Sequence, residues 1–149
     1  MTGRTRKMHA FFELHIEQGP ILEDENIDIG VVTHGQGLKW IQITLTGKES
    51  HTGSTPMPKR INAGLGMARV TELVNEIALE HGPNGVGAIG HLELYPNSRN
   101  IIPGRTVFTV DFRHPDKAAL EEMDAKLRKG AEKIAAEIGL GIEIEQTGG

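Results

Sequence analysis

The feature that most constrains the fold is the order in which two kinds of hydrophobic spacing follow each other after residue 38. Residues 86–95 are predicted to form a strand with several glycines, and apolar and polar residues alternate in three further segments, namely 38–47, 105–114 and 141–146. This is the period of half-buried strands. Residues 61–79 and 115–139 instead carry apolar residues at helical spacing,. The resulting order, β-α-β-β-α-β, predicts an α+β fold of the ferredoxin-like split βαβ type, with two helices on one face of a four-stranded antiparallel sheet.

The same spacing predicts which faces are buried. Pro115 and Asp116 are expected to open the second helix, and Gly139 to end it,. The predicted apolar stripes are Met67, Val70, Val74 and Ile77 on the first helix, and Leu120, Met123, Leu127, Ile134 and Ile138 on the second. In the third strand Phe108, Val110 and Phe112 should face the helices, which leaves Thr109, Asp111 and Arg113 on the open face.

Composition excludes several classes of protein. Of the 149 residues, 38% are hydrophobic and 24% charged, an ordinary globular composition, and the formal net charge of −4 argues against nucleic acid as a partner,. With no cysteine there can be no disulfide, and a metal would have to use histidine and carboxylate ligands,. No apolar run is long enough for a membrane span or a signal peptide,. We therefore expect a cytoplasmic protein.

The N-terminal segment contains two strand-like apolar runs, at 10–16 and 27–33, before the polar and glycine-rich residues 34–37, which suggest a domain boundary,. His15 alternates with large apolar residues, so its surroundings should be half buried,. Glu13 and Glu17 would share its strand face. Taken alone, these residues favour a structural histidine over a metal ligand, because Zn²⁺ needs at least three protein ligands. Both interpretations stay open at this point.

Five segments together resemble one enzyme family. They are ELHIEQGPILE at 13–23, IGVVT at 29–33, HTGSTPMPKR at 51–60, NSRNIIPG at 97–104 and VDFRHPD at 110–116. They look like the N-carbamoyl-L-amino-acid hydrolase, β-ureidopropionase and allantoate amidohydrolase group of the dimetal M20 superfamily. The resemblance implies that residues 1–34 are a stub of the catalytic metal-binding domain, and that 35–149 are the lid or dimerisation domain.

The resemblance also implies roles for single residues. His15 would be a ligand of a divalent metal pair, Zn²⁺ or Mn²⁺, with Co²⁺ and Ni²⁺ also suited to such ligands. Gln18 and Asn100 would contact substrate, and His51 would stabilise the oxyanion. Arg113 would bind the substrate carboxylate, a task that suits its planar guanidinium. The implied reaction is metal-assisted hydrolysis of a ureido C–N bond. Since the other ligands of that family are not in this sequence, we expect no firmly bound metal and no activity in this chain alone.

The chain departs from the family pattern in two places. Thr52 and Ser54 replace an alanine and a threonine in the histidine loop, and Arg60, Ile61 and Asn62 follow the loop where the family often has Arg-Asp. None of these residues has an implied catalytic role. The departures are therefore expected to affect substrate preference rather than the class of reaction.

The strand at 86–95 should be an edge of the sheet, and it is glycine-rich with one charged residue, Glu93,. We expect a homodimer through this strand and the helix at 61–79, with Met67, Val70 and Val74 beside their mates. By resemblance, His51 and Asn100 would then act in the partner's site. The alternative is a stand-alone ferredoxin-like module that binds a small ligand or regulates another protein. An RNA-binding sheet would need exposed aromatic residues and a basic face, which this sequence does not provide.

Overall fold

The computed structural model describes residues 7–149, which form two compact units. The first unit ends at Thr33, and the second runs from His34 to Gly149. None of the helices in residues 7–149 combines the length and apolar character that a membrane span requires.

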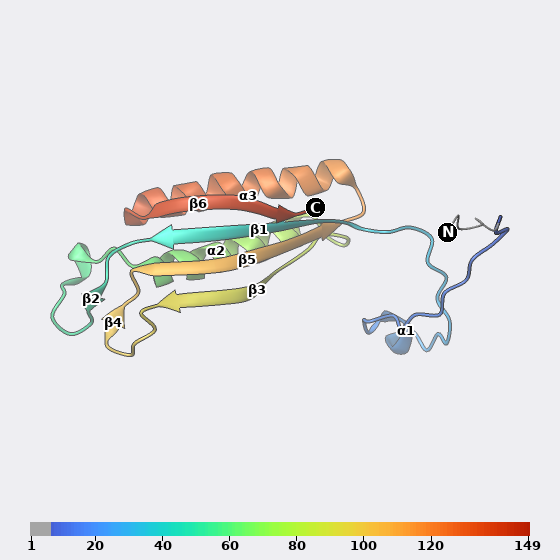
Figure 1. Cartoon of the computed structure of the whole chain (residues 1–149), viewed down its shortest axis with the longest axis horizontal. Coiled ribbons are helices and arrows are strands. Elements are labelled where there is room, and N and C mark those ends of the chain that lie inside the picture. The colour runs from blue at the N-terminus through green and yellow to red at the C-terminus, as the bar shows by residue number, and fades with distance from the viewer. Residues whose placement is uncertain (1–6) are drawn as a thin grey trace, which may run out of the picture. The chain divides into compact units, whose positions relative to one another are not determined.

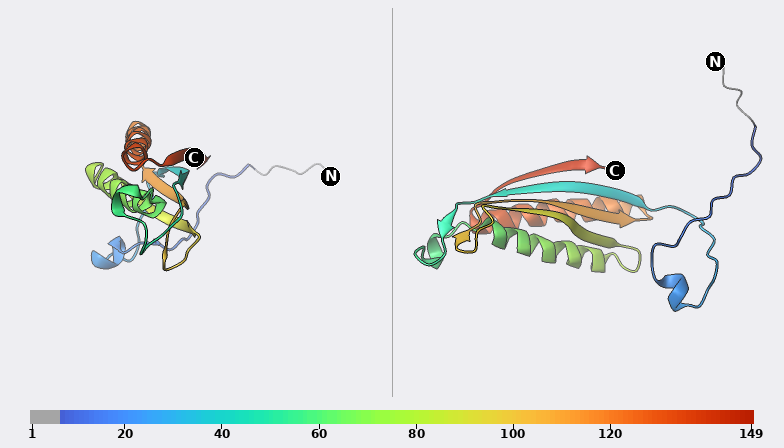
Figure 2. Two further views of the ribbon diagram at one scale, coloured as in Figure 1. Left: turned by 90° about the vertical axis from the view of Figure 1, so that its left-hand side faces the viewer. Right: turned by 60° about the horizontal axis from the view of Figure 1, so that its bottom comes forward.

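The second unit is built on a four-stranded antiparallel sheet with the strand order β3-β5-β1-β6. Its strands are β1 (Gly37–Thr46), β3 (Val86–Tyr95), β5 (Arg105–His114) and β6 (Gly141–Gly148). The helices α2 (Ala63–Glu80) and α3 (Lys117–Ile138) cover one face of this sheet, as Figures 1 and 2 show. The predicted α+β split βαβ fold is confirmed, with β3 and β6 as the edges.

The core lies between the sheet and the two helices. Phe108, Val110 and Phe112 are fully buried on the helix side of β5, and Thr109, Asp111 and Arg113 lie on the other face, as predicted. Larger apolar residues of β1 and both helices are also fully or almost fully buried, and they include Ile41, Ile43, Leu45, Val70, Val74, Ile77, Leu120, Met123 and Leu127. Because Val70 and Val74 are buried in the core of their own domain, they are not available to a partner helix. The expectation that they line a dimer contact is wrong.

Side chains at the helix ends explain where the helices begin and stop. The Asp116 carboxylate accepts hydrogen bonds from the amides of Ala118 and Ala119, at 2.6 and 3.0 Å. Gly139 adopts a left-handed conformation with φ of 82° and ends α3,. At the start of α2 the Asn62 side chain accepts a bond from the Leu65 amide. Asn62 is thus an N-cap, so this departure from the family pattern keeps a function that aspartate also performs.

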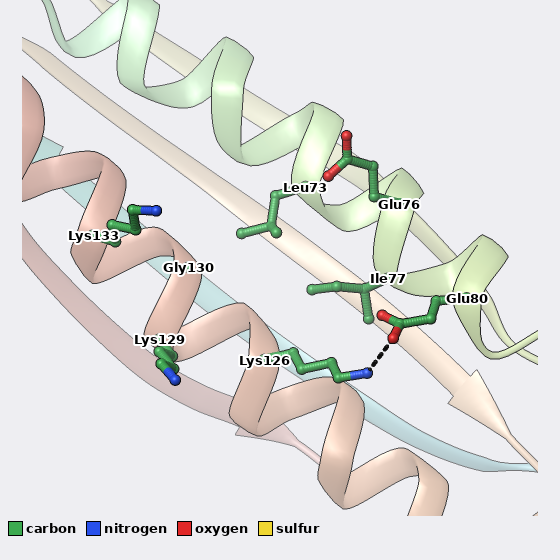
Figure 3. A pocket seen from close by; sticks show the side chains of 8 residues that line it. All are labelled: Leu73, Glu76, Ile77, Glu80, Lys126, Lys129, Gly130 and Lys133. Atoms are coloured by element: carbon green, nitrogen blue, oxygen red, sulfur yellow. Dashed lines mark ion pairs between the residues drawn. The ribbon is translucent and has the colours of Figure 1, made fainter.

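The side chain of Leu73 on α2 packs directly against Gly130 of α3. A Cβ atom placed on Gly130 would lie 2.4 Å from Leu73 Cδ2, so only glycine fits this contact without a shift. A groove between α2 and α3 is lined by charged side chains of both helices, and Lys126 pairs with Glu80 across it at 2.7 Å (Figure 3). The lysines come from α3 and the glutamates from α2.

The first unit has little regular structure. Its one helix among the described residues is the single turn α1 (Ile21–Asp24), whose first amides bond to the Glu17 carboxylate. The two strands predicted at 10–16 and 27–33 do not form, and apolar side chains such as Phe12 (92% exposed) face solvent. A strand needs a neighbour to bond its backbone, and the described part of this unit offers none.

Candidate functional site

The loop that carries His51 is joined to the loop that carries Asn100. The two-residue strands β2 (Ser50–His51) and β4 (Ile101–Ile102) pair antiparallel, with His51 opposite Ile101. The amide of Thr52 donates to the Asn100 carbonyl at 2.9 Å. Two residues that the resemblance implicates in one site are therefore brought together, although they are far apart in sequence.

His51 is exposed, and one of its ring nitrogens has a defined partner. The Gly53 amide donates to His51 Nδ1 at 3.0 Å. An amide N–H can only donate, so Nδ1 must present a lone pair, and in the neutral ring the proton lies on Nε2. His51 can therefore offer Nε2–H as a hydrogen-bond donor to an oxygen atom of a ligand.

Asn100 is exposed, and its side chain is oriented by a neighbour. The Ser98 hydroxyl donates to Asn100 Oδ1 at 3.0 Å. This bond occupies the carbonyl end of the amide and directs the NH₂ group away from Ser98. Asn100 therefore offers a second donor on the same pair of loops as His51.

Arg113 lies on the open face of the sheet beside Asp111. Its Nη2 is 2.9 Å from Asp111 Oδ2, and its Nε is 3.2 Å from Oδ1. Hydrogen bonding to Asp111, together with the charge of that carboxylate, raises the pKa of Arg113 above its ordinary value. Asp111 uses the Nε–Nη2 edge of the guanidinium, which leaves the Nη1–Nη2 edge for a second carboxylate.

Within one copy of the second unit, the two groups of candidates are far apart. The paired loops lie where β5 begins at Arg105, and Arg113 is near the other end of that strand (Figure 1). Eight residues of extended strand span about 26 Å. A molecule the size of an amino acid cannot contact His51 and Arg113 of the same copy at once.

His15 and Gln18 lie in the first unit. His15 is exposed, so the expectation that it is half buried is wrong for this chain, and its Nδ1 lies 2.5 Å from the Ile16 carbonyl oxygen. Gln18 has a φ of 61°, an uncommon conformation for a residue other than glycine,. Residues 7–149 contain no group of three or more histidine or acidic side chains placed to hold a metal. His15 by itself does not make a metal site.

Comparison with known proteins gives this arrangement a context. Residues 33–139 match the family model described as the peptidase dimerisation domain of the M20 group. The chain belongs to this family. It is 58% identical to an N-carbamoyl-L-amino-acid amidohydrolase from Rhizobium meliloti over 96% of its length, and 38% identical to the allantoate amidohydrolase of Escherichia coli K12 over 91%. Its fold matches the crystal structure of a hydantoinase/carbamoylase-family amidase from Burkholderia multivorans, with a TM-score of 0.92 and 59% identity over 96% of the chain.

This M20 dimerisation domain and its N-terminal segment are shorter than those relatives. The chain spans 34% of the Rhizobium protein, 33% of the Escherichia coli protein and 35% of the Burkholderia one. The likeness therefore covers about a third of each relative.

Two further residues of the M20 dimerisation domain make contacts that the sequence patterns do not indicate. Arg60 donates to two carbonyl groups of the His51 loop, those of Thr52 and Thr55. Lys39 is almost fully buried and pairs with Glu121 and Asp124 of α3, at 2.5 and 3.0 Å. The alternation in β1 already places Lys39 on the same face as Ile41, so a buried partner could have been sought for it.

Proposed function

We propose that this chain supplies the dimerisation domain, and an adjoining part of the catalytic domain, of an amidohydrolase that cleaves the ureido C–N bond of N-carbamoyl amino acids or related ureido acids. The observation that carries the proposal is the pairing of the His51 and Asn100 loops through the Thr52–Asn100 hydrogen bond, which brings together the two loops that carry these donors. The sequence similarity to carbamoyl-amino-acid and allantoate amidohydrolases supports it. The stand-alone module is disfavoured because these relatives carry the domain within much longer chains.

The chemistry of such a substrate matches the three polar groups of the domain. An N-carbamoyl amino acid has a carboxylate at one end and a ureido carbonyl at the other. Arg113 would bind the carboxylate through its unused edge. His51 Nε2–H and the Asn100 amide would bind the ureido carbonyl, where negative charge develops when water adds. One such donor typically lowers the barrier by about 3 to 4 kcal/mol.

The separation of these groups supports a shared site in a homodimer. One copy of the domain cannot bring His51 and Arg113 to one small molecule, so we infer that His51 and Asn100 act in the partner's site while Arg113 acts in its own subunit. The edge strand β3 is the proposed contact, since it pairs only with β5 among the described strands. Leu79 of α2 is 72% exposed and Leu92 of β3 is 48% exposed, so both offer apolar surface for it,.

The first unit is proposed to belong to the catalytic domain, with a boundary near residue 34. Its exposed apolar side chains are consistent with packing against a larger domain,. Gln18 is proposed to contact substrate and His15 to be one metal ligand. His15 alone does not satisfy a Zn²⁺ or Mn²⁺ ion, so the further ligands of a metal pair would have to come from outside residues 7–149.

The experiment is a kinetic comparison in the intact enzyme, with N-carbamoyl amino acids as substrates. Arg113→Lys should raise KM strongly, because the guanidinium binds the substrate carboxylate with two parallel hydrogen bonds and a lysine ammonium cannot replace both. His51→Ala should lower kcat by about 100- to 1000-fold with little change in KM. Arg69→Lys is the matched control, because among residues 7–149 the Arg69 guanidinium pairs with Glu137 alone, on the helix surface. If Arg113→Lys and His51→Ala change the same parameter, the assigned division of roles is wrong.

A further inference from the structure

The loop from His51 to Pro56 is held by hydrogen bonds from the side chain of Arg60, which lies outside the loop. Arg60 follows the short 3₁₀ turn η1 (Met57–Lys59) and reaches back over the loop. Its Nη2 donates to the Thr52 carbonyl at 2.7 Å, and its Nε donates to the Thr55 carbonyl at 3.0 Å. A guanidinium presents these two donors in one rigid fork, which the single ammonium of a lysine cannot do.

The two carbonyls that Arg60 binds lie on either side of the contacts that orient His51. The Thr52 amide donates to the Asn100 carbonyl, and the Thr55 amide donates to the His51 carbonyl at 3.2 Å. Between them is Gly53, whose amide holds the proton of the neutral imidazole on Nε2. The conformation of residues 51–55 therefore fixes both the position and the tautomer of His51. Arg60 stabilises that conformation through its hydrogen bonds to the Thr52 and Thr55 carbonyls.

We propose that Arg60 is a positioning residue for His51: by binding the carbonyls of Thr52 and Thr55, it keeps the Gly53 amide on His51 Nδ1 and so presents Nε2–H as the donor. This inference rests on the proposed function for its kinetic consequence. Its structural part concerns the imidazole of this chain only and can be measured without a reaction.

The structural test is ¹⁵N NMR of the histidine ring nitrogens in this 149-residue chain, with the His51 signals assigned by comparison with His51→Ala. In the unmodified chain, His51 should show a bare Nδ1 and a protonated Nε2 when neutral. In Arg60→Gln the two nitrogens should move toward averaged shifts, as the tautomers mix. Lys59→Gln removes the same charge one residue away and should leave the His51 shifts unchanged, since Lys59 is exposed and its ammonium bonds to none of the described residues.

The kinetic test uses the same substitutions in the intact enzyme. Arg60→Gln should lower kcat about 10- to 100-fold with KM changed less than about threefold, because His51 is displaced rather than removed. Arg60→Lys, which can keep one of the two carbonyls, should lie between Arg60→Gln and the unmodified enzyme. Lys59→Gln should behave like the unmodified enzyme.

The outcomes separate the two proposals. Unchanged His51 shifts in a folded Arg60→Gln chain would overturn the positioning role, and so would a loss of kcat in Lys59→Gln as large as in Arg60→Gln. A lower melting temperature with an unchanged tautomer would mean that Arg60 is merely structural. If the intact enzyme does not hydrolyse carbamoyl amino acids but Arg60→Gln still mixes the tautomers, the positioning role stands and the proposed function fails.

Discussion

At the scale of single residues, Lys39 is the side chain whose environment is least expected. It occupies a core position of β1, where Glu121 and Asp124 of α3 surround its ammonium, and Arg128 holds the other oxygen of Asp124 at 2.8 Å. Burial by itself lowers the pKa of Lys39, but the hydrogen bonds and charges of the two carboxylates outweigh it, so the pKa is raised overall. The stability that this pairing contributes is therefore fully present below the unfolded pKa of about 10.4, and it is lost as pH rises through the higher folded value.

We expect Lys39→Met to lower the free energy of unfolding by about 2 kcal/mol at pH 7, because Asp124 stays buried and keeps, in the described part of the chain, Arg128 alone as an ionic partner,. Urea unfolding of the chain measures this. Lys129→Met is the matched control on the exposed face of α3 and should change little. Replacing the pair together, with Lys39→Met and Asp124→Leu, should recover most of the loss. If the double variant is no more stable than Lys39→Met, lost packing rather than an unpaired charge explains the effect.

At the scale of elements, α3 depends on its cap at Asp116. Hydrogen bonds from the amides of Ala119 and Ala118 hold the pKa of Asp116 below its ordinary value. Asp116→Ala should lower the melting temperature by roughly 3 to 6 °C at pH 7. A lowered folded pKa contributes stability above the unfolded pKa of about 3.9, and that contribution is lost as pH falls through the folded value. The difference in melting temperature between Asp116→Ala and the unmodified chain should therefore shrink below pH 4. Thermal unfolding measured at several acid pH values checks this.

Asparagine at the same position is the control for charge, since it can still cap the helix without titrating there. Asp116→Asn should remain closer to the unmodified chain than Asp116→Ala does. A gap between Asp116→Ala and the unmodified chain that stays constant down to pH 2.5 would show that the carboxylate does not stabilise the helix by the contacts described.

How far the sequence predicts these elements depends on what each element needs. The alternation around Ile43 and the stripe through Met123 depend on burial within one domain, so the sheet and both helices follow from local spacing. The α3 caps follow from the residue types at Asp116 and Gly139. The strands expected near His15 depend on neighbours that the described part of the first unit lacks, and they do not form. The β2–β4 pairing that brings His51 to Asn100 joins two loops with no hydrophobic period, and neither spacing nor motif indicates it.

At the scale of the whole molecule, the distance between His51 and Arg113 predicts how defective subunits of the proposed homodimer behave when they are mixed. In a hybrid of His15→Ala and His51→Ala subunits, a site shared across the dimer would be intact on one side and doubly defective on the other. Random exchange of equal amounts makes half the dimers hybrid, so activity should recover to about a quarter of the unmodified level. If each site used its own His51, hybrids would stay inactive. Measuring activity after subunit exchange, with hybrid formation checked by mass, decides between them.

The same mixing tests the proposed contact strand. Leu92→Lys in both subunits places a charge on the β3 edge and should prevent recovery, because the hybrids no longer form. Gln146→Lys places the same charge on β6, the other edge, and should leave recovery unchanged. Recovery that survives Leu92→Lys, but not Gln146→Lys, would move the contact to the opposite edge of the sheet.

The hydrogen bond between the Thr52 amide and the Asn100 carbonyl also bears on attempts to change the range of substrates of the proposed enzyme. Because this bond joins the two loops, residues 50–60 and 96–104 would have to be exchanged together for those of a relative. The exchanged segment should include the residue of that relative that corresponds to Arg60. A library that randomises one loop at a time samples mostly mismatched pairs. Directed evolution of this domain should therefore couple the two segments in each clone, and choose its recombination crossovers outside both.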